Sequence, residues 1–289
     1  MIPASFEYLR AKTIPEAIGF LQQYGDDAKI LSGGQSLIPM MKFRLARPAY
    51  LIDINRIAGL SYIREEGGYL KIGGLTREAD LDTSPLIKAK YPILADTSRV
   101  IADPQIRNMA TVAGNLAHGD PANDHPATML ALRAEIVATG PRGERVLPVD
   151  GFFVTLFTTQ LEHDEIVTEI RVPVPPAHSG GAYMKLERKV GDFATAAVAV
   201  QMTVDAKGIC QKAGIALTNV GPTPIRASKA EEFLREKRLD EAGIRQAALL
   251  AAEAAQPSSD LRGPEEYKRA LVKELTRRAL QRAYERAIK

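Results

Sequence analysis

The sequence predicts an α+β fold in two parts, and three observations lead to that prediction. Strand-like apolar runs alternate with helix-like runs along the first half of the chain. Two pairs of apolar runs flank turns at Glu65–Gly68 and Gly140–Gly143, a pattern typical of β-hairpins. Three prolines and two glycines between Val172 and Gly181 then indicate a connection between domains.

The first half of the chain is expected to combine helices with short strands. A helix begins at Pro15, because proline is favoured in the first turn and apolar residues follow at helical spacing through Leu21. We expect further helix from Leu75 to Val100, interrupted at Pro85 and Pro92. The expected strands are Ala28–Leu31, Tyr50–Ile54, Leu60–Arg64, Tyr69–Ile72, Ala134–Ala138 and Arg145–Val149.

The second half is expected to hold a sheet followed by helices. The predicted strands are Ala182–Leu186, Ala196–Val204 and Ile209–Leu217. The last ~60 residues are rich in Ala, Glu, Arg and Leu, which favour helix. Residues 263–289 carry eight Lys or Arg and four Asp or Glu, and Pro264 precedes two acidic residues. We interpret this basic segment as a well-capped, solvated helix, so it predicts neither an anion site nor binding to nucleic acid.

Composition excludes several classes of protein. With 45% hydrophobic and 25% charged residues, the chain is an ordinary globular protein. No apolar run approaches the ~20 residues that span a bilayer. The N-terminal residues lack a basic region followed by an apolar one, so we expect no signal peptide and a cytoplasmic protein. A single cysteine, Cys210, excludes an internal disulfide and an iron–sulfur cluster held by this chain alone.

A first glycine-rich loop follows the strand Ala28–Leu31. Adjacent Gly33 and Gly34 let main-chain N–H groups point into one concavity, and Ser32 and Ser36 add hydroxyl groups. Such loops bind phosphate. The alternative is an ordinary turn, because glycine and serine are common in turns. The chain contains neither the P-loop motif nor the dinucleotide-binding GxGxxG motif after a strand.

A second loop, rich in small residues, covers Ala110–Asn115 and continues into Asp120–Pro126. Its small residues allow close approach of a ligand to the backbone, and threonine and asparagine side chains can form hydrogen bonds. The alternative for Asp124 is an N-cap of the helix that follows it. A metal site built from His118, His125 and nearby aspartates would match no known zinc spacing, so we expect no metal.

Four segments together closely resemble the FAD-binding medium subunit of molybdenum hydroxylases, such as carbon monoxide dehydrogenase and xanthine dehydrogenase. The resemblance runs from Ile2 to the C-terminal helix with matched spacing. The segments are SGGQSL at Ser32, IADPQIR at Ile101, ATVAGN with DPANDHP from Ala110, and YMKLERKVGDFATAA from Tyr183.

This resemblance implies a PCMH-type FAD-binding domain over residues 1–177, with lobes of about 1–55 and 56–177. A C-terminal domain with a small antiparallel sheet and helices would cover residues 178–289. Ser32, Gly33, Gly34, Gln35 and Ser36 would hold the FAD pyrophosphate from one side, and Thr111, Val112, Ala113, Gly114 and Asn115 from the other. The other implied contacts are Asp124 with the cofactor, Ile101, Ala102 and Leu161 along the flavin, Lys185 near the isoalloxazine ring, and Phe193 packed against it.

The residue pattern around Lys185 agrees with this assignment. In an alternating strand, Ala182, Met184 and Leu186 form one apolar face, so Tyr183 and Lys185 lie on the other. A cation there would favour the reduced flavin. The alternatives are a solvated lysine and, for Phe193, an ordinary core residue.

Three departures from the carbon monoxide dehydrogenase pattern weaken carbon monoxide as the substrate. Family members read AGGHS, TIGG and GDY, where this chain has Ser32 with Gln35, Ala113 and Phe193. Each replacement still permits FAD binding, because glutamine can donate hydrogen bonds and alanine is small.

The resemblance implies an oxidoreductase subunit that relays electrons and has no catalytic residue of its own. Its partners would be a large molybdopterin-binding subunit and a small [2Fe-2S] subunit, in a dimer of heterotrimers. Any contact with the inner face of a membrane would run through these partners. The terminal acceptor would be a quinone, NAD or oxygen.

Two alternatives belong to other functional classes. A stand-alone FAD oxidase or dehydrogenase of the same fold would need an active-site base, and neither His118 nor His125 is a convincing candidate. A regulatory module without flavin would tolerate bulky loop residues, yet both loops keep their glycines.

Overall fold

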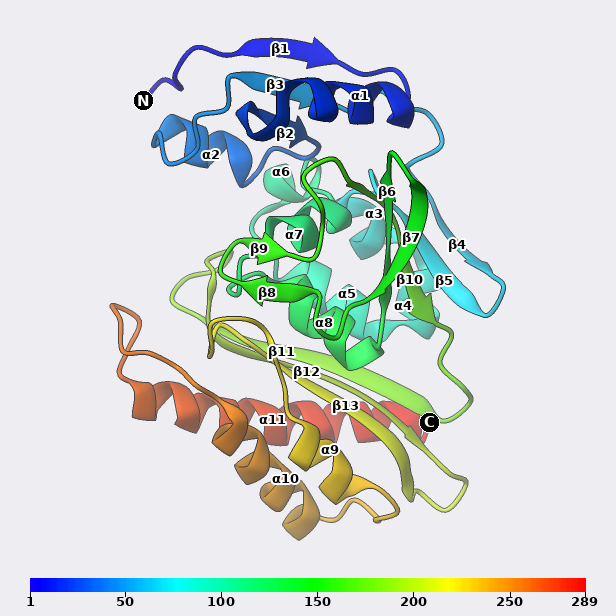
Figure 1. Cartoon of the computed structure of the whole chain (residues 1–289). Coiled ribbons are helices and arrows are strands. Elements are labelled where there is room, and N and C mark those ends of the chain that lie inside the picture. The colour runs from blue at the N-terminus through cyan, green and yellow to red at the C-terminus, as the bar shows by residue number, and fades with distance from the viewer.

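The protein contains three larger sheets stacked from the N-terminus to the C-terminus, and a fourth sheet of two short strands (Figure 1). The structure, a computed structural model, describes residues 1–289. A small three-stranded sheet lies at one end, a five-stranded sheet lies in the middle with helices beside it, and a four-stranded sheet backed by long helices lies at the other end. Two of the three are antiparallel, which confirms the predicted α+β class.

The first sheet is parallel, in the order β1-β3-β2. Thr13 caps α1 by accepting a hydrogen bond from the Glu16 N–H, and Pro15 lies in the first turn. Ile18 and Leu21 on α1 pack into a small core with Ile52 of β3. The elements are β1 (Glu7–Arg10), α1 (Ile14–Tyr24), η1 (Gly25–Asp27), β2 (Ala28–Leu31), α2 (Leu37–Lys42) and β3 (Tyr50–Asp53).

The middle sheet is antiparallel, in the order β4-β5-β10-β6-β7. Its helices are short because proline begins several of them, and the predicted interruptions at Pro85 and Pro92 are confirmed. The strands are β4 (Ile63–Glu66), β5 (Tyr69–Gly73), β6 (Glu135–Gly140), β7 (Gly143–Pro148) and β10 (Ile166–Pro173), beside the pair β8 (Phe153–Thr155) and β9 (Thr158–Thr159). The helices are α3 (Glu78–Thr83), α4 (Pro85–Lys90), α5 (Pro92–Arg99), α6 (Pro104–Arg107), α7 (Val112–His118) and α8 (Asp124–Leu132).

The third sheet lies between two layers of helices. Helices α5 and α8 of the middle part pack on one face, and α11 packs along β11 and β12 on the other (Figure 1). Small residues permit this close packing, since a Cβ on Gly214 would lie 2.1 Å from the Ala131 carbonyl oxygen. The elements are β11 (Ser179–Glu187), β12 (Ala194–Val204), β13 (Cys210–Thr218), β14 (Ile225–Arg226), α9 (Ser228–Leu234), α10 (Glu241–Ala254) and α11 (Glu265–Ala287).

Two expectations from the sequence are corrected. The turn of the first hairpin is Gly67–Gly68 alone, because Glu65 and Glu66 belong to β4, where their carboxylates pair with lysines. Helix α11 is not a solvated helix, since it buries one face against the sheet. None of the helices is both long enough and apolar enough to cross a membrane.

One ion pair ties the end of α11 to the middle part of the chain. Arg286 donates to both carboxylate oxygens of Asp96 on α5, with Nη1–Oδ2 and Nη2–Oδ1 distances of 2.6 and 3.1 Å, and also donates to the Gly181 carbonyl. The Asp96 side chain is 11% exposed, so this two-point contact is largely shielded from water.

We expect Arg286→Met to lower the free energy of unfolding by about 2 kcal/mol, because it removes the two-point donor of the shielded Asp96 carboxylate and leaves only the longer contacts with the Tyr183 N–H and Arg282. Urea unfolding followed by circular dichroism measures this. Arg278→Met is the matched control, since Arg278 is exposed on α11 and bonds only Glu274. Equal stability of the two variants would contradict the role of the contact.

Candidate functional site

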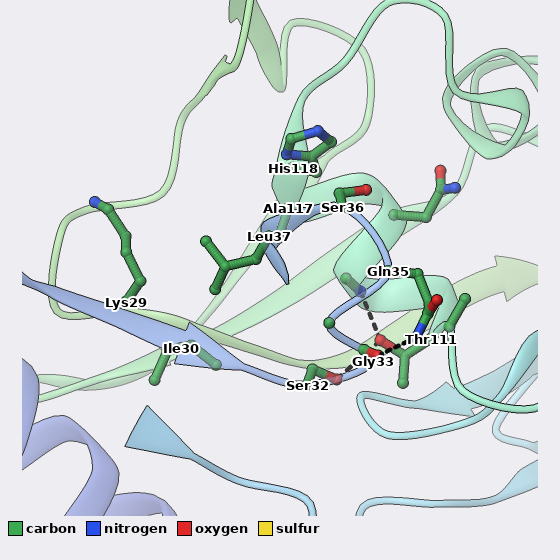
Figure 2. A pocket seen from close by; sticks show the side chains of 14 residues that line it. Lys29, Ile30, Ser32, Gly33, Gln35, Ser36, Leu37, Thr111, Ala117 and His118 are labelled. Carbon is green, nitrogen blue, oxygen red and sulfur yellow. Dashed lines mark hydrogen bonds between the residues drawn. The ribbon is translucent and has the colours of Figure 1, made fainter. Parts of the chain in front are cut away.

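The two glycine-rich loops meet at the junction of the first two sheets (Figure 2). The first loop connects β2 to α2, and the second leads into α7. The Ser32 and Thr111 hydroxyl oxygens lie 2.9 Å apart and share a hydrogen bond between the loops. Thr111 also caps α7 by accepting from the Gly114 N–H, with an Oγ1–N distance of 3.2 Å.

Glycine is required where the loops touch. A Cβ on Gly33 would lie 2.6 Å from the Met109 carbonyl oxygen and 2.9 Å from the Thr111 nitrogen, and neither backbone atom can move aside easily. Gly34 has φ +73°, in the left-handed region that favours glycine. The alternative that this diglycine is only an ordinary turn does not explain the contact of Gly33 with a second loop.

The first loop presents a row of free main-chain donors. The N–H groups of residues 33–37 donate to no acceptor within the protein. The loop lies beside a partly open pocket of about 300 Å³. The pocket is lined by Lys29, Ile30, Ser32, Gly33, Gly34, Gln35, Ser36, Leu37, Ala110, Thr111, Gly114, Asn115, Ala117 and His118. Since none of these is acidic and five successive donors are free, the pocket is suited to an anion such as a phosphate.

Three polar side chains of the pocket have distinct environments. Gln35 Nε2 donates to the Gly33 carbonyl oxygen at 3.1 Å, so this side chain bonds its own loop. Asn115 Oδ1 is buried without a partner and can accept from a hydroxyl or N–H of a ligand. Burial lowers the pKa of His118, whose ring lies 5.0 Å from that of Phe157, so the imidazole is uncharged at neutral pH.

Leu161 lies on the apolar side of the same loops. It lines a smaller cavity of about 80 Å³ that shares Ile30, Ser32, Gly114 and Ala117 with the main pocket. Ala113, also a predicted site residue, is buried and lines this smaller cavity as well. Val112 turns its side chain into the core, and its N–H donates to the Thr76 carbonyl.

A second group of predicted residues surrounds a buried ion pair between the middle part and β11. Lys185 Nζ lies 3.0 Å from Asp124 Oδ2 and 3.2 Å from Glu187 Oε2, and donates to the Val100 carbonyl at 3.0 Å. The Tyr183 hydroxyl donates to Asp124 Oδ1 at 2.6 Å. Burial raises the pKa of Asp124 against the lowering effect of Lys185.

The predicted alternation of β11 is confirmed. Tyr183 packs in the core of the middle part, whereas Ala182, Met184 and Leu186 pack against the C-terminal helices. The solvated alternative for Lys185 is wrong, because its side chain is 3% exposed. The N-cap alternative for Asp124 is also wrong, since Asn123 holds that position and the Asp124 carboxylate is bonded by Tyr183 and Lys185.

The remaining predicted residues are Ile101, Ala102 and Phe193. Lys185 donates to the carbonyl of Val100, the residue before Ile101. Gly191, at φ +85°, packs its backbone against Ala102. Phe193 is 45% exposed, so the alternative of a core phenylalanine is wrong. None of the three lines the loop pocket.

The predicted site residues therefore form two groups, one at the loops and one at the ion pair. The structure adds six residues to the loop pocket that were not among the predicted site residues, namely Lys29, Ile30, Leu37, Ala110, Ala117 and His118. Lys29, Ile30, Leu37 and Ala110 adjoin the two predicted loops in the sequence, which is the signal that could have indicated them.

Comparisons with known proteins cover the whole chain. A family described as the FAD binding domain in molybdopterin dehydrogenase matches residues 4–175, and a family described as the CO dehydrogenase flavoprotein C-terminal domain matches residues 181–283. The carbon monoxide dehydrogenase medium chain of Hydrogenophaga pseudoflava is 46% identical, over 99% of each chain. The 6-hydroxypseudooxynicotine dehydrogenase complex subunit alpha of Paenarthrobacter nicotinovorans is 39% identical, over 99% of this chain and 97% of the relative.

A solved structure has nearly the same fold. It is a carbon monoxide dehydrogenase from Hydrogenophaga pseudoflava that lacks the Mo-pyranopterin moiety of the molybdenum cofactor. One of its chains superposes with a TM-score of 0.96 at 49% identity, with 99% of both chains covered.

We expect Gly33→Ala to weaken FAD binding by at least about tenfold, which corresponds to ~1.4 kcal/mol, because the added methyl group forces the two loops apart. Fluorescence titration of the apoprotein measures the dissociation constant. Gly19→Ala on α1 is the control, since a Cβ there meets nothing within 4 Å. Unchanged FAD affinity in Gly33→Ala would show that the loop contact does not shape the site.

Proposed function

The chain belongs to the family of FAD-binding medium subunits of molybdenum hydroxylases, and we propose that it relays electrons from a partner subunit to a terminal acceptor. It is an oxidoreductase subunit, and FAD is its cofactor. The single observation that carries the proposal is the row of free N–H groups at residues 33–37 beside a pocket without acidic residues. An anionic pyrophosphate fits such a pocket without like-charge repulsion.

The two groups of site residues divide the cofactor between them in this proposal. Residues 32–36 hold the pyrophosphate from one side and residues 111–115 face it from the other, where Val112 contributes no bond because its N–H donates to the Thr76 carbonyl. The buried Asn115 Oδ1, which has no partner within the protein, accepts from a sugar hydroxyl. Leu161, which borders the small cavity next to the loops, contacts the flavin side of the cofactor in this proposal. Ile101, Ala102, Asp124, Lys185 and Phe193 face the flavin end, where Phe193 offers an exposed aromatic ring.

The chain's own residues set the electrostatics at the flavin end. FAD, when bound, supplies the exchange between one-electron and two-electron transfer. Lys185 places a positive charge between two carboxylates, and Tyr183 holds one of them, Asp124, by a short hydrogen bond. These residues bind, orient and tune the cofactor, and no residue of the chain needs to act as an acid or base on an organic substrate.

The proposed partners are a large molybdopterin-binding subunit and a small [2Fe-2S] subunit, assembled as a dimer of heterotrimers. The similar proteins are named as a medium chain and as a subunit of a dehydrogenase complex, which supports assembly with other chains. The only cysteine, Cys210, is buried, so any iron–sulfur cluster belongs to a partner. We propose residues 1–177 and 178–289 as the two domains, and the cytoplasm as the compartment, because the chain has no disulfide.

We propose that a partner selects the substrate. One similar protein belongs to a carbon monoxide dehydrogenase and another to a 6-hydroxypseudooxynicotine dehydrogenase, and both match this chain over 99% of its length. Subunits similar to this chain over nearly its whole length thus belong to dehydrogenases named for two chemically different substrates, which favours substrate recognition outside this subunit.

The proposal is tested by the visible absorption spectrum of the natively purified complex and by chromatography of the cofactor released on heating. We expect a flavin spectrum, released FAD, and iron–sulfur absorbance from co-purified chains. A colourless complex that takes up no added FAD would overturn the function, and FAD without any co-purifying chain would favour the stand-alone oxidase.

We expect Asp124→Asn to raise the midpoint potential of the bound flavin by an amount on the order of 30 mV, because one negative charge beside Lys185 is lost. Redox titration followed by absorbance measures the shift. Asp205→Asn, in the turn at the far end of β12, is the control. An unchanged potential in a variant that still binds FAD would place Asp124 away from the flavin.

A further inference from the structure

Two side chains outside the pocket connect the two glycine-rich loops. Asn55 follows β3, and Arg77 precedes α3. Arg77 Nη2 donates to Asn55 Oδ1 at 2.6 Å. Neither residue lines the pocket, and neither lies in the four segments that carry the family resemblance. We refer to Asn55 and Arg77 together as the loop clamp.

Asn55 binds the first loop. Its side-chain nitrogen donates to the Ser32 carbonyl at 2.8 Å and to the Leu31 carbonyl at 3.3 Å, where β2 passes into the loop. Asp53 fixes this amide, because its Oδ1 accepts from the Asn55 side chain at 2.7 Å and from the Asn55 main chain at 2.8 Å. Tyr8 of β1 in turn donates to the other carboxylate oxygen of Asp53, so the carboxylate that fixes the amide is itself held in place.

Arg77 binds the second loop. Its Nη1 donates to the Met109 carbonyl, and its main chain forms a β-bridge with Thr111. The planar guanidinium thus donates at the same time to Met109 and to Asn55. A lysine ammonium is a single point of donation and lacks this fork.

The clamp acts on the direction of the loop donors. Because a trans peptide points its C=O and N–H in opposite directions, fixing the Ser32 carbonyl on Asn55 directs the Gly33 N–H to the other side of the loop. That N–H is the first of the free donors beside the pocket. On the other loop, the Met109 carbonyl oxygen that Arg77 holds is the atom nearest to where a Cβ on Gly33 would lie.

Resting on the proposed function, we propose that Asn55 and Arg77 are positioning residues for the cofactor pyrophosphate. They hold the Ser32 and Met109 carbonyl groups, and thereby keep the two loops at the separation at which their donors converge on one anion. Since both residues act through the loops, replacing either one weakens the binding of every ligand that carries a pyrophosphate group, including ADP.

The test compares Arg77→Met and Arg77→Lys in the full-length apoprotein, by titration with FAD and with ADP. We expect both variants to raise both dissociation constants by at least about tenfold, because neither side chain can bond Asn55 and Met109 together. Arg171→Met is the matched control, since Arg171 pairs with Glu169 in the same domain, and we expect a change below about twofold.

Three outcomes overturn the inference in different ways. Wild-type affinity in both Arg77 variants shows that the clamp does not position the loops. Full affinity in Arg77→Lys with loss in Arg77→Met shows that charge alone matters. A wild-type protein that binds neither FAD nor ADP overturns the proposed function itself, and is thereby distinguished from failure of the clamp.

A second variant keeps the test decisive if Arg77→Met fails to fold. Asn55→Ala removes the donor to Ser32 and is expected to weaken ADP binding by a similar factor. In the double variant Asn55→Ala with Arg77→Lys, the loss is expected to be smaller than the product of the single losses, because the two residues act as one unit. Independent, multiplying effects would overturn the clamp.

Discussion

The contact between the Gly33 backbone and the backbone of residues 109–111 is the constraint on which the site depends. It joins a loop of the first sheet to a loop that leads into α7, so the two parts can meet only where one of them has no side chain. The shared Ser32–Thr111 hydrogen bond lies at the same point. The distance between the two loops at this contact sets the position of the groups that line the pocket, including the free N–H donors of residues 33–37.

A second constraint acts where β11 meets the middle part of the chain. Lys185 cannot reach water there, so its charge requires the carboxylates of Asp124 and Glu187 beside it. The same interface holds the pair of Arg286 with Asp96. Burying these charges is favourable only while the sheet and helices α5 and α8 stay packed together, so the flavin end of the proposed site depends on both parts of the chain.

Local structure was largely predictable from the sequence, because its signals are local. Proline in the first turn of a helix, glycine at a turn and alternation along β11 each act within a few residues. Partners distant in the sequence were not predictable. The residues around Asp124 indicate only a helix cap, because its partner Tyr183 lies 59 residues away. The basic segment that contains Arg286 indicates only a solvated helix, because Asp96 lies 190 residues away. Asn55 and Arg77 likewise lie far in the sequence from the carbonyl groups that they bond.

The close packing of the third sheet limits how this subunit can be recombined with its relatives. Gly214 lies against the Ala131 carbonyl of α8, and Gly180 lies against that of Ala283 on α11, each with no room for a methyl group. The two faces of the sheet are therefore matched to helices from both halves of the chain. A chimera joined at the proline-rich connection would pair a sheet from one subunit with helices from another, whose surfaces are not matched. A functional exchange would therefore have to carry α5 and α8 along with the C-terminal half.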